Sequence, residues 1–195
     1  MKKIIWILFI VIGFLEIQAQ KKARFGLKSG WNISDISNLN SEKQNNFYVG
    51  GFVAIKLSKQ FTLQPELNYS RQGAKLNDTN LDFLDEVEIN YLSLSILAKV
   101  YIAKGLHLDF GQYLDVDVDD NLVHSDHFLY LPHFDLGFIG GIGIDFLQNF
   151  TLEARYKFGL IDVYDINSND PYYYQIENKN TNQVIQLGLA YKIDY

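Results

Sequence analysis

The chain contains the run FDLGFIGGIGIDF (Phe134–Phe146), the link LQN (Leu147–Asn149) and the run FTLEARYKFGL (Phe150–Leu160). In both runs every second residue is apolar, and the residues between them are mostly polar, charged or glycine. A period of two places the two sets on opposite faces of a β-strand. Because the link is long enough only for a hairpin turn, the stretch predicts two paired antiparallel strands of about 11 residues or more.

Strands of this length and pattern are typical of a membrane barrel. Strands of soluble sheets usually run about 5–6 residues, whereas a strand that crosses a membrane needs about 9–11, with alternate side chains facing lipid. We expect a bulge or a missing ladder bond at Pro65, because proline is unfavourable in a paired strand. The same alternation recurs along the chain and predicts strands over residues 23–33, 47–57, 61–72, 89–102, 106–118, 134–146, 150–160 and 183–195.

The connections between these eight strands alternate strictly between long and short. Three short links follow residues 57, 102 and 146, and four long polar segments cover 34–46, 73–88, 119–133 and 162–182. Short periplasmic turns and long extracellular loops are the layout of an outer-membrane barrel. The sequence therefore predicts an all-β fold, an eight-stranded antiparallel up-and-down transmembrane β-barrel. The alternative is a soluble lipocalin-like barrel, in which the apolar face would point inward to a ligand.

The N-terminus supplies an export signal. Lys2 and Lys3 precede the apolar run 4–15, and Ala19 precedes a polar residue. This order predicts a secretory signal peptide over residues 1–19, cleaved after Ala19, followed by a barrel domain over 20–195. The run is too short to span a membrane comfortably as an anchor. We expect the exported protein to reside in the cell outer membrane.

Composition excludes several classes of protein. The chain has 195 residues and no cysteine, so it forms one domain without disulfides. Removing residues 1–19, which hold Lys2, Lys3 and Glu16, changes the net charge from −6 to −7. An acidic chain of this kind does not suit nucleic acid. The expected contacts are outer-membrane lipid and, during insertion, the barrel-assembly machinery; no cofactor or metal centre is expected.

Charges of both signs lie on the inward face of the predicted barrel. The interior of an eight-stranded barrel is just wide enough for side chains to fill it, and an unpaired charge there costs several kcal/mol. We therefore predict a buried ionic network rather than an open, ion-selective conduit, which would need a lining of one sign. The predicted network comprises Lys56, Glu66, Lys99, Asp109, Glu153 and Arg155.

Other polar groups cluster where residues 106–118 meet the following loop. Carboxylates there predict a weak divalent-cation rim, or else a solvated acidic edge, because the run lacks the glycine and distal glutamate of an EF-hand loop. The acidic residues are Asp115, Asp117, Asp119 and Asp120. His124, His127 and His133 lie in no zinc-binding frame, and Ser125 between His124 and Asp126 does not fix a triad. We predict that the protein is not an enzyme; the alternative is a barrel enzyme that modifies lipid.

Four runs resemble the PorT-like outer-membrane β-barrel family of Bacteroidota. They are LQPELNYSRQG (Leu63–Gly73), DLGFIGGIGIDF (Asp135–Phe146), FTLEARYKFGL (Phe150–Leu160) and QLGLAYKI (Gln186–Ile193). The resemblance implies a small, porin-like outer-membrane barrel and covers essentially all of residues 20–195. Many members of the family have no assigned activity, and from the filled interior we expect a structural or partner-binding role rather than an open pore. One branch of the family takes part in protein secretion across the outer membrane, so secretion or envelope proteins are possible partners.

Overall fold

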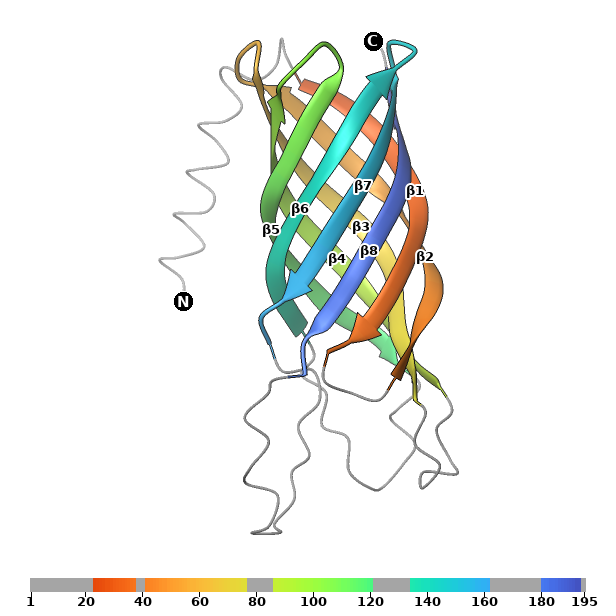
Figure 1. Cartoon of the computed structure of the whole chain (residues 1–195). Helices are drawn as coiled ribbons and strands as arrows, with labels where there is room; N and C mark the ends of the chain where they lie inside the picture. Colours follow the sequence, from red (N-terminus) through yellow and green to blue (C-terminus); the bar gives the residue numbers. More distant parts are fainter. Residues whose placement is uncertain (1–22, 38–40, 77–85, 121–133, 162–179, 194–195) are drawn as a thin grey trace, which may run out of the picture.

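A computed structural model describes residues 23–37, 41–76, 86–120, 134–161 and 180–193. These residues form eight strands that close into a barrel in sequence order (Figure 1). The strands are β1 (Ala23–Ile36), β2 (Ser41–Lys56), β3 (Phe61–Leu76), β4 (Glu86–Tyr101), β5 (Leu106–Asp120), β6 (Phe134–Phe146), β7 (Phe150–Gly159) and β8 (Asn182–Lys192). Each strand is antiparallel to its neighbours, and β1 pairs with β8 from Gly26↔Lys192 to Ile36↔Asn182. The predicted fold is confirmed.

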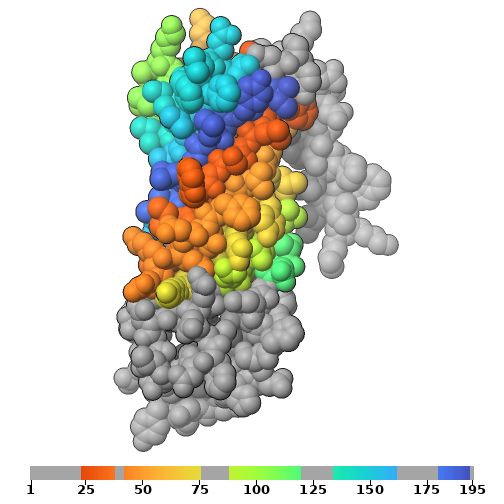
Figure 2. All heavy atoms as spheres, turned by 90° about the vertical axis from the view of Figure 1, so that its right-hand side faces the viewer, coloured from red at the N-terminus to blue at the C-terminus, as the bar shows by residue number. Residues whose placement is uncertain are grey.

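The alternation of the sequence sets which side chains face out. Large apolar side chains such as Leu27, Trp31 and Ile96 are exposed on the outer wall, while polar and charged side chains are buried inside. Neighbouring strands cross the outer wall as oblique bands, with β8 against β1 and β1 against β2 (Figure 2). An apolar outer wall around a polar interior is the reverse of a soluble lipocalin-like barrel. Within the described residues, no helix is long and apolar enough to cross a membrane.

The strands extend past the ends predicted on the loop side. β1 and β2 pair as far as Ser34↔Gln44, so only residues 37–40 separate them, and the long first loop predicted over 34–46 is wrong. Polar residues there continue the strand because alternation of apolar side chains is required only where the wall meets lipid. β3 and β4 likewise pair as far as Lys75↔Glu86.

Pro65 interrupts its ladder as predicted. The β2–β3 pairing stops at Phe52↔Glu66 and resumes at Ile55↔Leu63 without a change of register. Val53 and Ala54 are therefore missing from the β2–β3 ladder, although both still pair with β1. The disturbance is a gap rather than a bulge, because proline lacks the N–H that a ladder bond requires. The other edge of β3 stays paired, and Pro65 lies opposite Ile96 of β4.

The glycines of β6 make room for large side chains inside the barrel. A Cβ built on Gly137 would lie 2.7 Å from the Tyr113 ring, and one on Gly141 would lie 2.7 Å from Cγ of Arg155. A Cβ on Gly143 would lie 2.3 Å from the His107 ring. These distances are shorter than van der Waals contact. The interior side chains therefore pack directly against the backbone of β6, where no side chain intervenes.

Candidate functional site

The interior of the barrel is the candidate site, and Arg155 lies at its centre. The Arg155 side chain projects from β7 and donates to Glu66 of β3 at 2.9 Å and to Asp109 of β5 at 2.9 Å. Its Nη2 also lies 2.9 Å from Oε1 of Glu153. All of these side chains are buried. A guanidinium presents its donors in a planar fork, so one arginine can join three carboxylates from three directions.

Two lysines complete this network. Nζ of Lys28 on β1 lies 2.9 Å from Glu66 and 2.9 Å from Glu153. Nζ of Lys99 on β4 lies 2.8 Å from the other oxygen of Glu153. We define the central network as Lys28, Glu66, Lys99, Asp109, Glu153 and Arg155. It joins five of the eight strands and balances three positive side chains with three negative ones, so the cost of desolvating each charge is offset by close partners.

Two further clusters flank the central network. On the loop side, Lys157 lies 2.6 Å from Asp115 and 4.0 Å from the centre of the Tyr113 ring. The Tyr113 hydroxyl donates to Asp135 at 2.7 Å. Gln72 donates to Asp115 at 2.9 Å. This loop-side cluster lies between the central network and the loop end of the barrel.

The cluster on the side of the short turns is built around Asp145. This carboxylate accepts hydrogen bonds from Tyr101 at 2.9 Å, Thr151 at 2.5 Å and Lys192 at 2.9 Å. His107 connects it to the centre, because its Nδ1 lies 2.6 Å from Asp109 and its Nε2 lies 3.8 Å from Asp145. The polar groups therefore form a chain along the length of the barrel. Buried Tyr48, Phe52 and Leu97 occupy the space beside it.

The structure brings five of the six residues of the predicted ionic network together: Glu66, Lys99, Asp109, Glu153 and Arg155. Lys56 does not join them. It has inward parity, but it is the last residue of β2, so its side chain lies at the rim and is exposed. Lys28 of β1, which the predicted network did not include, joins it instead of Lys56 of β2. Its inward parity at mid-strand was the signal that could have identified it.

The structure separates the residues of the predicted cation rim. Asp115 turns into the barrel and pairs with Lys157, whereas Asp117 is half-buried and Asp119 is exposed. A register shift beside Tyr91 separates Asp119 from the regular alternation of β5. The side chain of Asp120 and residues 121–133, with Ser125 and the three loop histidines, lie outside the described part. In that described part, no three His, Asp or Glu side chains are grouped to hold a metal ion.

Comparison with known proteins supports an outer-membrane barrel. Residues 18–165 match the family described as "Outer membrane protein beta-barrel domain". No curated protein matches the sequence. Three structures share the fold at low identity: Neisserial surface protein A (14% identity, TM-score 0.53, covering 88% of this chain and 97% of that one), OprG of Pseudomonas aeruginosa (13%, 0.52, 89% and 97%) and Ail of Yersinia pestis in a nanodisc (12%, 0.52, 88% and 100%).

Proposed function

Because the chain belongs to the outer membrane protein beta-barrel domain family, we propose that it is a closed barrel with a structural or partner-binding role, and not a diffusion pore. The observation that carries this proposal is the central network, in which Arg155 contacts carboxylates on both sides of the interior. An eight-stranded barrel leaves little bore once such side chains fill it. A closed barrel acts through its lipid-facing wall and its ends.

The charges of the interior also argue against ion selection. A selective channel lines its path with one sign of charge and leaves its groups free to meet the ion. In this barrel Glu66, Glu153 and Asp109 are already paired with Arg155, Lys28 or Lys99. An ion entering the barrel would have to break these buried pairs and pay their desolvation cost.

Planar-bilayer recording tests this proposal. We expect the purified protein to give no stable, reproducible conductance steps. A Glu66→Gln variant that is first shown to fold serves as the comparison, because it removes one interior charge with little change in side-chain volume. Conductance steps in the natural protein whose ion selectivity shifts in Glu66→Gln would contradict the proposal and would make Glu66 and Arg155 pore-lining residues.

The narrower placement in the PorT-like family is a further proposal. It is supported by the four runs that resemble that family, of which Leu63–Gly73 lies on β3 and Gln186–Ile193 on β8. Association with protein secretion is the alternative role that this resemblance suggests. Cross-linking and pull-down from native outer membrane distinguishes the two. Secretion components among the captured proteins would favour the alternative, and their absence would favour an independent structural barrel.

We also propose that the barrel has no catalytic role. His107 lies beside Asp109, but both are sealed in the interior, and the described carboxylates there already have cationic or hydroxyl partners. A general base must come within hydrogen-bond reach of its substrate. Lipid mass spectrometry of a deletion strain tests this proposal, and the accumulation of one unmodified lipid species would refute it.

Export through a signal peptide over residues 1–19 is likewise a proposal, supported by the two lysines and the apolar run that precede Ala19. These residues lie outside the described part of the chain. N-terminal sequencing of the protein recovered from outer membranes should begin at Gln20. A sequence that begins at Met1 would show that the segment is retained.

A further inference from the structure

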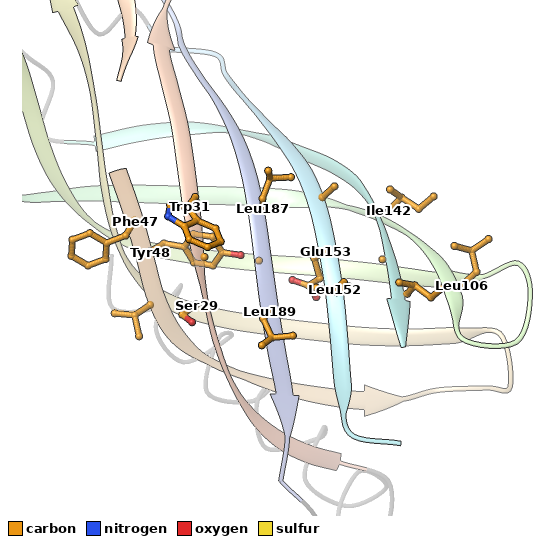
Figure 3. Close-up of a pocket in the computed structure, with 16 residues that line it drawn as sticks. Ser29, Trp31, Phe47, Tyr48, Leu106, Ile142, Leu152, Glu153, Leu187 and Leu189 are labelled. Atoms are coloured by element: carbon orange, nitrogen blue, oxygen red, sulfur yellow. The ribbon is translucent and has the colours of Figure 1, made fainter. Parts of the chain in front are cut away.

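The lipid-facing wall contains a groove of about 840 Å³. Trp31 and Phe47 stand at one end of it, Leu106 stands at the other, and Leu187, Leu189 and Leu152 lie between them (Figure 3). The groove therefore crosses six strands, from β2 through β1, β8, β7 and β6 to β5.

Strand register shows how the groove is built. Most of its lining residues fall on two adjacent cross-strand rows of the outer wall. The others have inward parity and lie between these rows along the strands: Gly30, Tyr48, Gly143, Glu153 and Gly188. One row runs Val49, Ser29, Leu189, Leu152, Ile144 and Leu106. The other runs Phe47, Trp31, Leu187, Ala154 and Ile142. Because both rows lie across the strands, the channel between them is oblique to the barrel axis.

Small residues make the wall hollow along this path. Ser29 and Ala154 face outward among leucines and isoleucines, so each leaves a gap in its row. Beneath them Gly30 and Gly188 lie opposite one another on β1 and β8, which makes the wall thin at that point. Tyr48 packs against this thin wall from inside, where a Cβ on Gly188 would collide with its hydroxyl oxygen.

The dimensions of the groove match a lipid chain. Five strand-to-strand steps of about 4.8 Å give a length of roughly 24 Å. Strands of outer-membrane barrels tilt by about 35–45°, so this path climbs roughly 14–17 Å along the membrane normal. That height is about half of a hydrocarbon core of roughly 30 Å.

We propose that this groove binds one acyl chain of an outer-membrane lipid in a fixed position. The groove is continuous with the apolar wall that meets lipid, so acyl chains surround it at high concentration. Most of its lining is apolar, with Ser29, Tyr48 and Glu153 as the polar residues. A slender chain can follow an oblique channel two rows wide. A second barrel would need a broad surface, since a stable interface buries about 800 Å² per partner.

Trp31 provides a direct probe of this proposal. It lines the groove and is 69% exposed. In a full-length chain that carries Trp6→Phe, Trp31 is the only tryptophan. We would titrate a phospholipid with brominated acyl chains into the folded protein in detergent micelles and follow quenching of Trp31 fluorescence. A bound chain should give quenching that saturates at one lipid per barrel and that unbrominated lipid reverses.

Two matched variants separate binding in the groove from general contact with lipid. Ala154→Leu fills the groove two strands away from Trp31, whereas Ala98→Leu makes the same change on the outer face of β4, away from the groove. We expect Ala154→Leu to weaken the apparent affinity by about tenfold or more, and Ala98→Leu to leave it unchanged. If Ala154→Leu fails to fold, Ser29→Leu fills the same groove.

Three results would overturn the proposal. The first is quenching that rises linearly without saturation in the natural sequence. The second is equal saturation in Ala154→Leu and in Ala98→Leu. The third is a dimer, seen by native mass spectrometry, that Ala154→Leu dissociates, because the occupant would then be a second copy of the chain. The planar-bilayer test does not depend on this groove, so the two proposals fail separately.

Discussion

A single side chain, Arg155, links carboxylates across the interior of the barrel. Its guanidinium contacts Glu66, Asp109 and Glu153 from three strands, and Lys28 and Lys99 supply the remaining positive charge. The buried charge of each member is compensated only while its partners are present, since an unpaired buried charge is costly. Single substitutions in this network should therefore have large effects on stability.

Lys28→Met should destabilise the barrel by about 3–5 kcal/mol, because it leaves Glu66 and Glu153 with one cation fewer in a buried site. Lys56→Met is the matched control. It makes the same change at an exposed rim residue and should have little effect. Urea unfolding in lipid vesicles, followed by tryptophan fluorescence, measures both.

A double variant checks that charge balance is the cause. Lys28→Met combined with Glu66→Gln removes one charge of each sign, so it should lose less stability than the sum of the two single changes. Additive losses would show that Lys28 contributes packing rather than charge compensation.

Alternation along the strands predicts which residues face inward, and this identified five members of the central network. It does not predict how far along the barrel a residue lies. Lys56 shares the inward parity but reaches solvent because β2 ends there. Asp115 was expected at a rim but lies inside, opposite Asp135 and beside Lys157. Such positions depend on the register between strands, which no single strand encodes.

β6 contains adjacent glycines with opposite roles. Gly141 faces inward, where a Cβ would lie 2.6 Å from the carbonyl oxygen of Ala154 and 2.7 Å from Cγ of Arg155. Gly140 faces outward and has nothing within 4 Å of that position. Gly141→Ala should therefore lower the free energy of unfolding by about 1–3 kcal/mol.

Gly140→Ala is the control for this prediction. It should be neutral or stabilise the strand by up to about 1 kcal/mol, because alanine has less conformational freedom in the unfolded chain. Equal decreases in the free energy of unfolding of the two variants, measured in urea, would show that interior side chains do not pack closely against Gly141.

Strand number, strand order and the short turns could be predicted because lipid requires unbroken alternation wherever the wall crosses the membrane. The ends of β1, β2, β3 and β4 could not, because beyond the apolar band polar residues suit strand and loop equally. The closure between β1 and β8 was implied by the strand count. The groove on the outer wall depends on small residues of β1, β7 and β8 that lie beside one another, and only the register places them together.

At the scale of the whole molecule, the described strands enclose polar and charged side chains that are buried, and a closed barrel requires that water does not reach them. The chain contains no cysteine, so single introduced cysteines report local access without background. Ser95 is buried on the inner face of β4, opposite Glu66, and Ser58 is exposed in a short turn. Replacing either serine with cysteine changes only one atom of the side chain.

The most direct measurement is the reaction of these two cysteines with a water-soluble maleimide in the folded, detergent-solubilised protein. Ser58→Cys should react rapidly, and Ser95→Cys should react only after unfolding in urea, because the central network and its neighbours exclude water from the interior. Reaction of Ser95→Cys in the folded barrel at the rate of Ser58→Cys would contradict the account, since it would show a water-filled path through the barrel.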